Sequence, residues 1–458
     1  MCAPAFRDMQ SLPVLRTQDE NGNLIVLFDR SPEVKKEEIK CLDFKEEPCG
    51  FREKQGFGFL QVQFGDRIGL GGRYEVLRKL GWGMQSSIWL AKDTVKDRFV
   101  AIKALNGYTT TFVKNGKMHE LEILRCLSSQ GKGMCDTHCL VLLDDFIEPG
   151  KGKGDGEHLC TVTDALGSSV SGFRRAIGGL TKPLTKKILR DTLKGLESLH
   201  SLGIVHTDLH PSNILADLGY GPHSFDIGAY LNSSPPERHP PELSWGGEYV
   251  QVAVSQPFPT PPSELWESLS FILADFGASQ FLNKKTRDHI SPIDQRAPET
   301  FLRLPWDEKV DIWSFGCLVF RFINDQNLFK TDLPGLPPDL AMMYQILLHT
   351  DDRLPADTIR SSPLAMKYLD PETGQHLQLS SLVVVVTNFT VSIQGWLTVD
   401  LPRDRIDLYE INKGIGALNK PSDLDGGTAL MRKCLRLDPK DRASAKELLQ
   451  DPWLNSDT

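Results

Sequence analysis

The chain has 458 residues, of which 40% are hydrophobic and 24% charged, an ordinary composition for a protein with a sizeable core. Its formal net charge of −8 argues against broad nucleic-acid binding, so we expect no direct nucleic-acid partner. The longest aliphatic run, 382–386, is far shorter than the roughly 18 apolar residues of a membrane helix, so no membrane partner is expected either. Nine scattered cysteines and no leader-like start favour an intracellular location, in the cytoplasm, the nucleus or both.

The first part of the chain divides into a charged stretch and a strand-rich stretch. Residues 1–60 combine charged clusters with short apolar pieces, and we interpret them as a charged, peripheral N-terminal extension. In residues 61–166, apolar and polar residues alternate in short runs, as they do in half-buried strands. The pattern predicts strands at 74–80, 87–91, 98–104, 140–147 and 158–163, and a helix near 117–127.

Residues 167–454 are mostly helical in pattern. Leucines and isoleucines between residues 184 and 199 form one apolar stripe, and 309–323 and 443–454 are two further predicted helices. A strand-rich part followed by a helix-rich part predicts an α+β protein with two lobes. Residues 219–268 are rich in Pro, Gly and Ser and are interpreted as an insert in the helical lobe. The β-prone tract 382–395 could be a buried strand, an unusual insertion or an error in the assumed coding sequence.

A glycine-containing turn lies between the first two predicted strands. Its residues are Leu80, Gly81, Trp82, Gly83, Met84, Gln85, Ser86, Ser87 and Ile88. Glycines at 81 and 83 let a backbone approach phosphate groups closely, and such a turn can place N–H groups over them. Taken alone, an ordinary glycine hairpin explains these residues at least as well.

The third predicted strand supplies a candidate cation. Strand alternation places Ala101 and Lys103 on one face, where a small residue leaves room for a flat ring and the ammonium reaches phosphate oxygens. A lysine in such a position needs a counter-charge, and Glu120 on the following helix can supply it. On its own, a surface lysine on an edge strand remains the simpler interpretation.

A loop after the long amphipathic helix carries the more specific signal. In the stretch His206 to Asn213, Asp208 can accept a proton from an attacking hydroxyl, and Asn213 can coordinate a divalent ion. Asp275, in the triplet Asp-Phe-Gly, supplies a second metal carboxylate. Asp217 also begins such a triplet, but it follows Asn213 too closely to bring its carboxylate back to the same metal.

These residues, in this order, resemble the eukaryotic protein kinases from about residue 73 to residue 453. The resemblance implies the bilobal kinase fold, with a small β-rich N-lobe (61–166) and a larger helical C-lobe (167–454). It also implies ATP and Mg²⁺ as cofactors. The roles it implies are a phosphate-binding Lys103, its helix partner Glu120, a catalytic base Asp208, and the metal ligands Asn213 and Asp275.

The resemblance extends to later landmarks and to the adenine pocket. It implies that Glu299 of the Ala-Pro-Glu segment pairs with Arg442, and that Asp311 braces the catalytic loop. Adenine would lie among the glycine-turn residues, Ala101, a back wall at Thr163, and the hinge. The hinge residues of this pocket are Asp164, Ala165 and Leu166.

Within that family the chain is most similar to the SR-protein kinases. Shared features are the entry Arg78 to Gly83 into the glycine turn, Ser86 in place of a third glycine, Thr207 in place of Arg, and the insert before Asp275. The resemblance implies a serine/threonine protein kinase whose partner is an Arg/Ser-rich protein substrate, with a role in splicing regulation. Because the neutral Thr207 cannot pair with a phosphorylated activation loop, we also expect activity without that phosphorylation.

One departure keeps two alternatives open. His210 stands where Ser/Thr-specific protein kinases have a lysine. The order of residues in the 206–213 loop also resembles that of small-molecule phosphotransferases of the aminoglycoside and choline kinase type. Those enzymes, however, lack the Ala-Pro-Glu segment and the Asp-x-Trp-Ser-Phe-Gly helix found here. The second alternative is a pseudokinase scaffold, which His210 and the tract 382–395 would favour.

Overall fold

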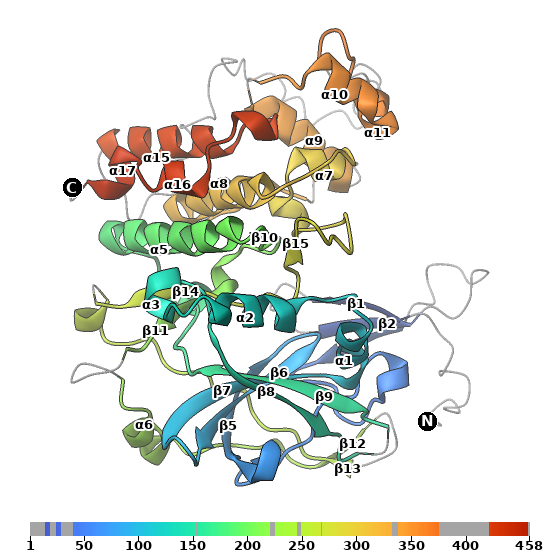
Figure 1. Cartoon of the computed structure of the whole chain (residues 1–458), viewed down its shortest axis with the longest axis vertical. Helices are drawn as coiled ribbons and strands as arrows, with labels where there is room; N and C mark the ends of the chain where they lie inside the picture. The colour runs from blue at the N-terminus through green and yellow to red at the C-terminus, as the bar shows by residue number, and fades with distance from the viewer. Residues whose placement is uncertain are drawn as a thin grey trace, which may run out of the picture. The chain divides into compact units, whose positions relative to one another are not determined.

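The computed structural model describes residues 14–18, 24–28, 40–152, 154–219, 225–244, 249–266, 268–331, 338–350, 352–374 and 421–456 (Figure 1). These residues fall into two units. Unit 1 takes those within 1–133, 140–168 and 217–265, and unit 2 takes those within 134–139, 169–216 and 266–458. The tract 382–395 lies outside the described residues, so its interpretation stays open.

Unit 1 is built on an antiparallel sheet of six strands, in the order β4-β5-β6-β7-β9-β8. The strands are β4 (Arg67–Ile68), β5 (Tyr74–Trp82), β6 (Ser86–Asp93), β7 (Arg98–Leu105), β8 (Leu142–Pro149) and β9 (Glu157–Asp164). Two helices accompany them, α1 (Gly107–Lys114) and α2 (Glu120–Ser129). A separate three-stranded sheet contains β1 (Val14–Gln18), β2 (Leu24–Phe28) and β3 (Lys40–Phe44). The predicted strands and the predicted helix are therefore confirmed.

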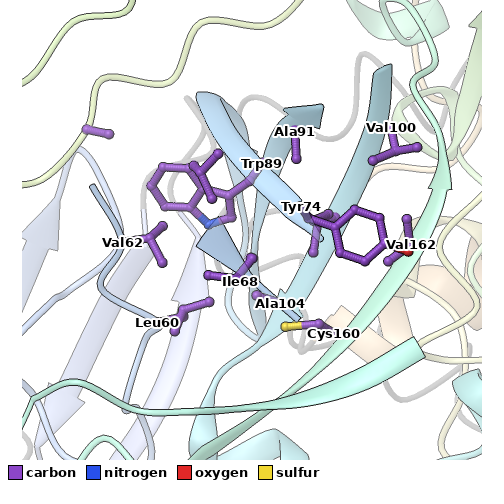
Figure 2. Packing of buried hydrophobic residues seen from close by; sticks show 13 residues of the cluster. Leu60, Val62, Ile68, Tyr74, Trp89, Ala91, Val100, Ala104, Cys160 and Val162 are labelled. Carbon is purple, nitrogen blue, oxygen red and sulfur yellow. The ribbon is translucent and has the colours of Figure 1, made fainter. Parts of the chain in front are cut away.

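One face of the six-stranded sheet carries the apolar core of unit 1 (Figure 2). Alternate residues of β7 enter this core, since Val100, Ile102 and Ala104 are buried there, whereas Ala101 and Lys103 are half-buried on the other face. This is the two-residue period of a strand with two different faces. The core therefore fixes the side of the sheet to which Lys103 belongs.

Part of the segment before the sheet is buried, contrary to the interpretation of residues 1–60 as peripheral, and its last residue, Leu60, belongs to this core. Phe51, Phe57, Phe59 and Leu60 are each at most 1% exposed. The short 3-10 turn η3 (Glu53–Gln55) and the backbone around it bond to α1 and to the β8–β9 turn. Because charged residues separate the aromatic residues of this segment, its sequence resembles that of an exposed segment although its aromatic side chains are buried.

The insert also lies differently from the prediction, because residues 217–265 are part of unit 1. It contains α6 (Ile227–Ser233), the short strands β12 (Glu242–Leu243) and β13 (Tyr249–Val250), and the 3-10 turn η6 (Ser263–Leu265). Leu218 and Phe258 pack with Leu90 of β6 in a second apolar cluster. The insert is thus an extra layer on the β-rich unit and not part of the helical unit.

Unit 2 is helical (Figure 1). Its longest helix, α5 (Lys182–Ser201), buries the predicted leucine stripe against α16 (Ala445–Leu448), α17 (Pro452–Asn455) and β14 (Ser270–Leu273). Helix α8 (Lys309–Asn324) is almost wholly buried and packs on α15 (Pro421–Cys434). Within the described residues, the other helices of this unit are α3 (Met134–Thr137), α4 (Val170–Ile177), α7 (Pro298–Phe301), α9 (Pro338–His349), α10 (Ala356–Ser361) and α11 (Pro363–Tyr368).

Two small ladders and three short turns complete the parts of unit 2 that matter for the site. Strand β10 (Ile204–Val205) pairs with β15 (Gln280–Phe281), and β11 (Ile214–Asp217) pairs with β14. The 3-10 turn η5 (Pro211–Asn213) lies between β10 and β11 in the chain, η7 (Ile293–Gln295) precedes α7, and η8 (Pro439–Asp441) lies between α15 and α16. Across the described ranges, no helix is both long and apolar enough to cross a membrane.

Candidate active site

The predicted lysine–glutamate pair is present in unit 1. Lys103 leaves β7 on the face opposite the core, and its Nζ lies 2.5 Å from Oε1 of Glu120, the first residue of α2. The lysine side chain is 20% exposed and the glutamate side chain 5%. A buried carboxylate therefore orients an ammonium that remains accessible, as a phosphate-binding cation requires.

The glycine turn joins β5 to β6 through residues 83–85. A Cβ added at Gly81 or Gly83 would meet no atom within 4 Å, so packing does not explain why these positions carry glycine. Open space beside a backbone is what the approach of a phosphate group requires. The turn is closed by the N–H of Gly83, which donates to the carbonyl of Ser86 at 2.8 Å.

Asn106, which no sequence motif identified, holds the tip of this turn. Its side-chain amide donates to the carbonyl of Met84 at 3.2 Å, and its backbone N–H donates to the carbonyl of Gln85 at 2.8 Å. The Asn106 Oδ1 also caps α1 by accepting the N–H of Thr109. An asparagine before a helix is a recognisable cap signal, but nothing local indicates its bonds to the turn.

The adenine-pocket residues lie along β7 and β9 and in the segment after β9. Ala101 pairs directly with Thr163 across the two strands, and Thr163 is 6% exposed. Leu80 and Ala165 pack against the second apolar cluster, whose buried members include Leu218 and Phe258 of the insert. The insert therefore packs against two segments predicted to line the adenine site, the end of β5 and the residues after β9, and no pattern in the sequence indicates this contact.

In unit 2, one buried carboxylate holds the catalytic loop. Asp311 of α8 is fully buried and accepts the backbone N–H groups of His206, at 2.7 Å, and Thr207, at 2.8 Å. Thr207 has φ +64°, a left-handed conformation that costs a β-branched residue of the order of 1–3 kcal/mol. These two bonds stabilise that conformation, as the predicted brace would.

The proposed base and the proposed metal ligands belong to one hydrogen-bonded network. The side-chain amide of Asn213 donates to the carbonyl of Asp208 at 3.0 Å, and the N–H of Ala274 donates to the carbonyl of Asn213 at 2.9 Å. Asp275 follows directly, with φ +61°, and its carboxylate accepts the N–H of Gly277 at 3.3 Å. Asp217 instead ends β11, where its carboxylate accepts the N–H of Gly219.

The donor set suits Mg²⁺. Asp275 supplies a carboxylate and Asn213 an amide oxygen, both hard ligands. Across the described ranges, no group of three or more His, Cys, Asp or Glu side chains could hold a metal by itself. Magnesium at a phosphoryl-transfer site commonly takes only one or two protein side chains and fills its other positions with water and phosphate oxygens.

The segment after Asp275 is held by hydrogen bonds of Thr207 and Gln280 and by the guanidinium of Arg287, whose Nη2 donates to the carbonyl of Gly277 at 3.3 Å. The Thr207 hydroxyl donates to the carbonyl of Ala278 at 2.8 Å. Gln280, 1% exposed, accepts the N–H of Thr286 at 2.7 Å and donates to the carbonyl of Arg287 at 2.9 Å. No local signal in the sequence identified Gln280, because its partners are defined only by the folded loop.

The last predicted landmark is also present. Arg442 binds Glu299 bidentately, with Nη1 2.6 Å from Oε1 and Nη2 2.7 Å from Oε2. Both side chains are at most 1% exposed. This fork-to-fork geometry is the strong form of a guanidinium–carboxylate pair, and it fixes the segment that carries Ala-Pro-Glu.

Comparison with known proteins agrees with this architecture. The protein kinase domain family matches residues 74–228 and 265–454. The serine/threonine-protein kinase SRPK of Physarum polycephalum is 26% identical over 434 residues, which cover 90% of this chain and 92% of that protein. SRSF protein kinase 3 of Homo sapiens is 37% identical over 169 residues, 35% of this chain and 28% of its own length. A crystal structure of a kinase domain matches with a TM-score of 0.58 at 20% identity, covering 87% of this chain and 99% of the other. The chain therefore belongs to the protein kinase family, as an SRPK-like serine/threonine kinase.

Proposed function

We propose that this kinase transfers the γ-phosphoryl group of Mg-ATP to serines of Arg/Ser-rich splicing-factor proteins. The observation that carries the proposal is the network in unit 2 that ties Asp208 to Asn213, and Asn213 to the residue before Asp275. A base and two metal ligands held by one set of hydrogen bonds keep their spacing when substrate binds. We further propose an intracellular location, in the cytoplasm or the nucleus.

Each side chain has a definite role in this proposal. Lys103 holds nucleotide phosphates, and Asn213 and Asp275 hold the Mg²⁺ that neutralises phosphate charge. Asp208 orients the substrate hydroxyl and accepts its proton. The hydroxyl oxygen forms the new bond to the γ-phosphorus while the bond to the β–γ bridging oxygen breaks, and ADP leaves. Positioning and charge stabilisation supply most of the catalysis in such reactions.

The test of the base is Asp208→Asn, with Asp217→Asn as the matched control. Removing a general base costs about 10²–10⁴ in rate, so Asp208→Asn should lose at least about 100-fold in turnover while still binding Mg-ATP. Asp217→Asn should turn over normally, because Asp217 lies outside the network. Normal turnover by Asp208→Asn would refute the assignment of the base.

The substrate class needs its own experiment. Relatives named SRPK and SRSF protein kinase support Arg/Ser-rich substrates. Transfer of radiolabelled phosphate should be compared for an Arg-Ser peptide, the same peptide with Glu in place of Arg, a generic basic protein and small aminoalcohols. We expect the Arg-Ser peptide to be preferred. Equal labelling of the Glu peptide would exclude Arg-Ser specificity, and labelling of the aminoalcohols would favour a small-molecule substrate.

We also propose that activity needs no phosphate on the activation segment. Supporting this, Thr207 and the buried Gln280 hold that segment by neutral hydrogen bonds. Phosphatase-treated enzyme should keep its turnover, whereas Gln280→Ala should lower it. Loss of most turnover on phosphatase treatment would contradict the proposal.

A further inference from the structure

His210 stands immediately before the 3-10 turn η5, which ends in Asn213. Its imidazole Nδ1 accepts the backbone N–H of Ser212 at 3.2 Å, so the side chain caps the turn. Its own carbonyl accepts the N–H of Asn213 at 2.9 Å. His210 therefore shapes, through its side chain and its backbone, the turn that presents a proposed metal ligand.

The cap also fixes which ring nitrogen carries the proton. A neutral imidazole whose Nδ1 accepts a hydrogen bond carries its hydrogen on Nε2. That Nε2 lies 3.7 Å from Oδ2 of Asp208, and the two side chains are 28% and 30% exposed. The ring nitrogen opposite the cap therefore lies beside the proposed base, at a distance longer than a hydrogen bond but short enough for an electrostatic contact.

We propose that His210 is a positioning residue that couples the base to the metal ligand. Its Nδ1 holds the turn that carries Asn213, and its Nε2–H restrains the carboxylate of Asp208 in the orientation that meets the substrate hydroxyl. This inference rests on the proposed role of Asp208 as the base. The carboxyl of Asp294, in η7, also interacts electrostatically with the ring.

Histidine combines two properties that the obvious replacements separate. A lysine has three donors and no acceptor, so it can reach Asp208 but cannot cap the turn. An asparagine is a preferred cap, but its amide is too short to reach the carboxylate of Asp208. Each replacement therefore removes one half of the proposed role and keeps the other half.

The experiment measures kcat, peptide KM and the Mg²⁺ concentration for half-maximal rate in His210→Asn, His210→Lys and His210→Ala. His210→Asn should keep the Mg²⁺ dependence and lower kcat about 10- to 100-fold, as for a misoriented catalytic group. His210→Lys should keep kcat within a few-fold of the wild type and raise the Mg²⁺ requirement roughly fivefold, the equivalent of a lost cap. His210→Ala should show both defects, and peptide KM should be unchanged in all three. Melting temperature and Mg-ATP binding confirm that each variant is folded.

Two outcomes would overturn the inference. One is an unchanged kcat in His210→Asn, and the other is an identical pattern of defects in the Asn and Lys variants. Asp208→Asn, assayed alongside, separates this inference from the proposed function. If Asp208→Asn keeps its turnover, the assignment of the base is wrong. If it loses turnover while His210→Asn does not, only the role of His210 is wrong.

Discussion

The two units each bury an arginine completely, and they compensate its charge in opposite ways. In unit 2, every N–H of Arg442 has an acceptor: Glu299 takes two, and the carbonyls of Lys309, Arg436 and Leu437 take the others. In unit 1, none of the guanidinium nitrogens of Arg78 has a hydrogen-bond partner among the described residues. Its guanidinium carbon lies 4.8 Å from the ring centroid of Tyr230 in the insert.

The difference shows that burial of a charge is not by itself a stabilising feature. A desolvated cation is costly unless its donors are satisfied. Arg442 regains that cost through five hydrogen bonds and one opposite charge, whereas Arg78 has an aromatic face worth about 2 kcal/mol when desolvated. We therefore expect Arg442 to increase the stability of unit 2 and Arg78 to decrease the stability of unit 1.

The largest expected effect is that of Arg442→Met. It leaves the carboxylate of Glu299 buried without a partner, and breaking such a pair costs roughly 3–5 kcal/mol. Urea unfolding should show this loss in the free energy of unfolding. Arg442→Lys keeps the charge but not the fork, so its loss should be smaller. If Arg442→Met were as stable as the wild type, the expectation that Arg442 stabilises unit 2 would be wrong.

Lys79→Met should have the next largest effect. Lys79 is fully buried in unit 1, where its Nζ lies 2.6 Å from Glu46, 3.2 Å from the carbonyl of Ala253, and in contact with Glu47. Burial lowers the pKa of Lys79 to about 8, and its ammonium cannot bind a carboxylate through the two parallel hydrogen bonds that Arg442 makes. We expect a loss of about 2–3 kcal/mol, the scale of hydrogen bonds to charged groups. Ser255→Ala, which removes one bond to Glu46 and leaves Lys79 in place, is the milder control.

Asp93 extends the comparison, because it is a buried charge in unit 1 whose hydrogen-bond partners are present, unlike the charge of Arg78. Hydrogen bonds from Arg73, and then from the backbone N–H groups of Lys96 and Val95, lower the pKa of Asp93 to about 2. Since this pKa is below the unfolded value of about 3.9, the carboxylate contributes its full stability above about pH 4 and loses it as the pH falls towards 2. Melting temperature measured from pH 5 to pH 2 should fall less steeply in Asp93→Asn than in the wild type. Parallel curves would show that Asp93 does not carry the acid sensitivity.

The smallest expected effect is that of Arg78→Met, and it is the most direct test. No hydrogen bond is lost, and a buried cation is replaced by an apolar side chain, so stability should be unchanged or slightly higher. Tyr230→Leu should cost about 0.5–2 kcal/mol in the wild type, through loss of the cation–π contact, and less in the Arg78→Met background. A double-mutant cycle by urea unfolding measures that coupling. A clear loss of stability in Arg78→Met alone would show that Arg78 makes a stabilising interaction other than its contact with the Tyr230 ring.

The sequence predicted well wherever a residue type and its element define the chemistry together. Lys103 on a strand and Glu120 at the start of a helix were predicted as a pair, and the structure contains that pair. The landmarks Asp311 and Glu299 were placed correctly for the same reason. Motif spacing indicates which element carries each charged residue. Few residues can then be its partner, so the pair can be predicted.

Contacts between segments far apart in the chain were decided only by the tertiary structure. The segment around Phe57 was interpreted as peripheral, because charged neighbours masked its buried aromatic residues, and the insert was assigned to the wrong unit. The bonds from Asn106 to the glycine turn, and from Lys79 to Glu46 and Ala253, join residues with no shared periodicity. Local pattern fixes which face of an element is apolar. Which distant segment covers that face depends on long-range packing, and no run of neighbouring residues records it.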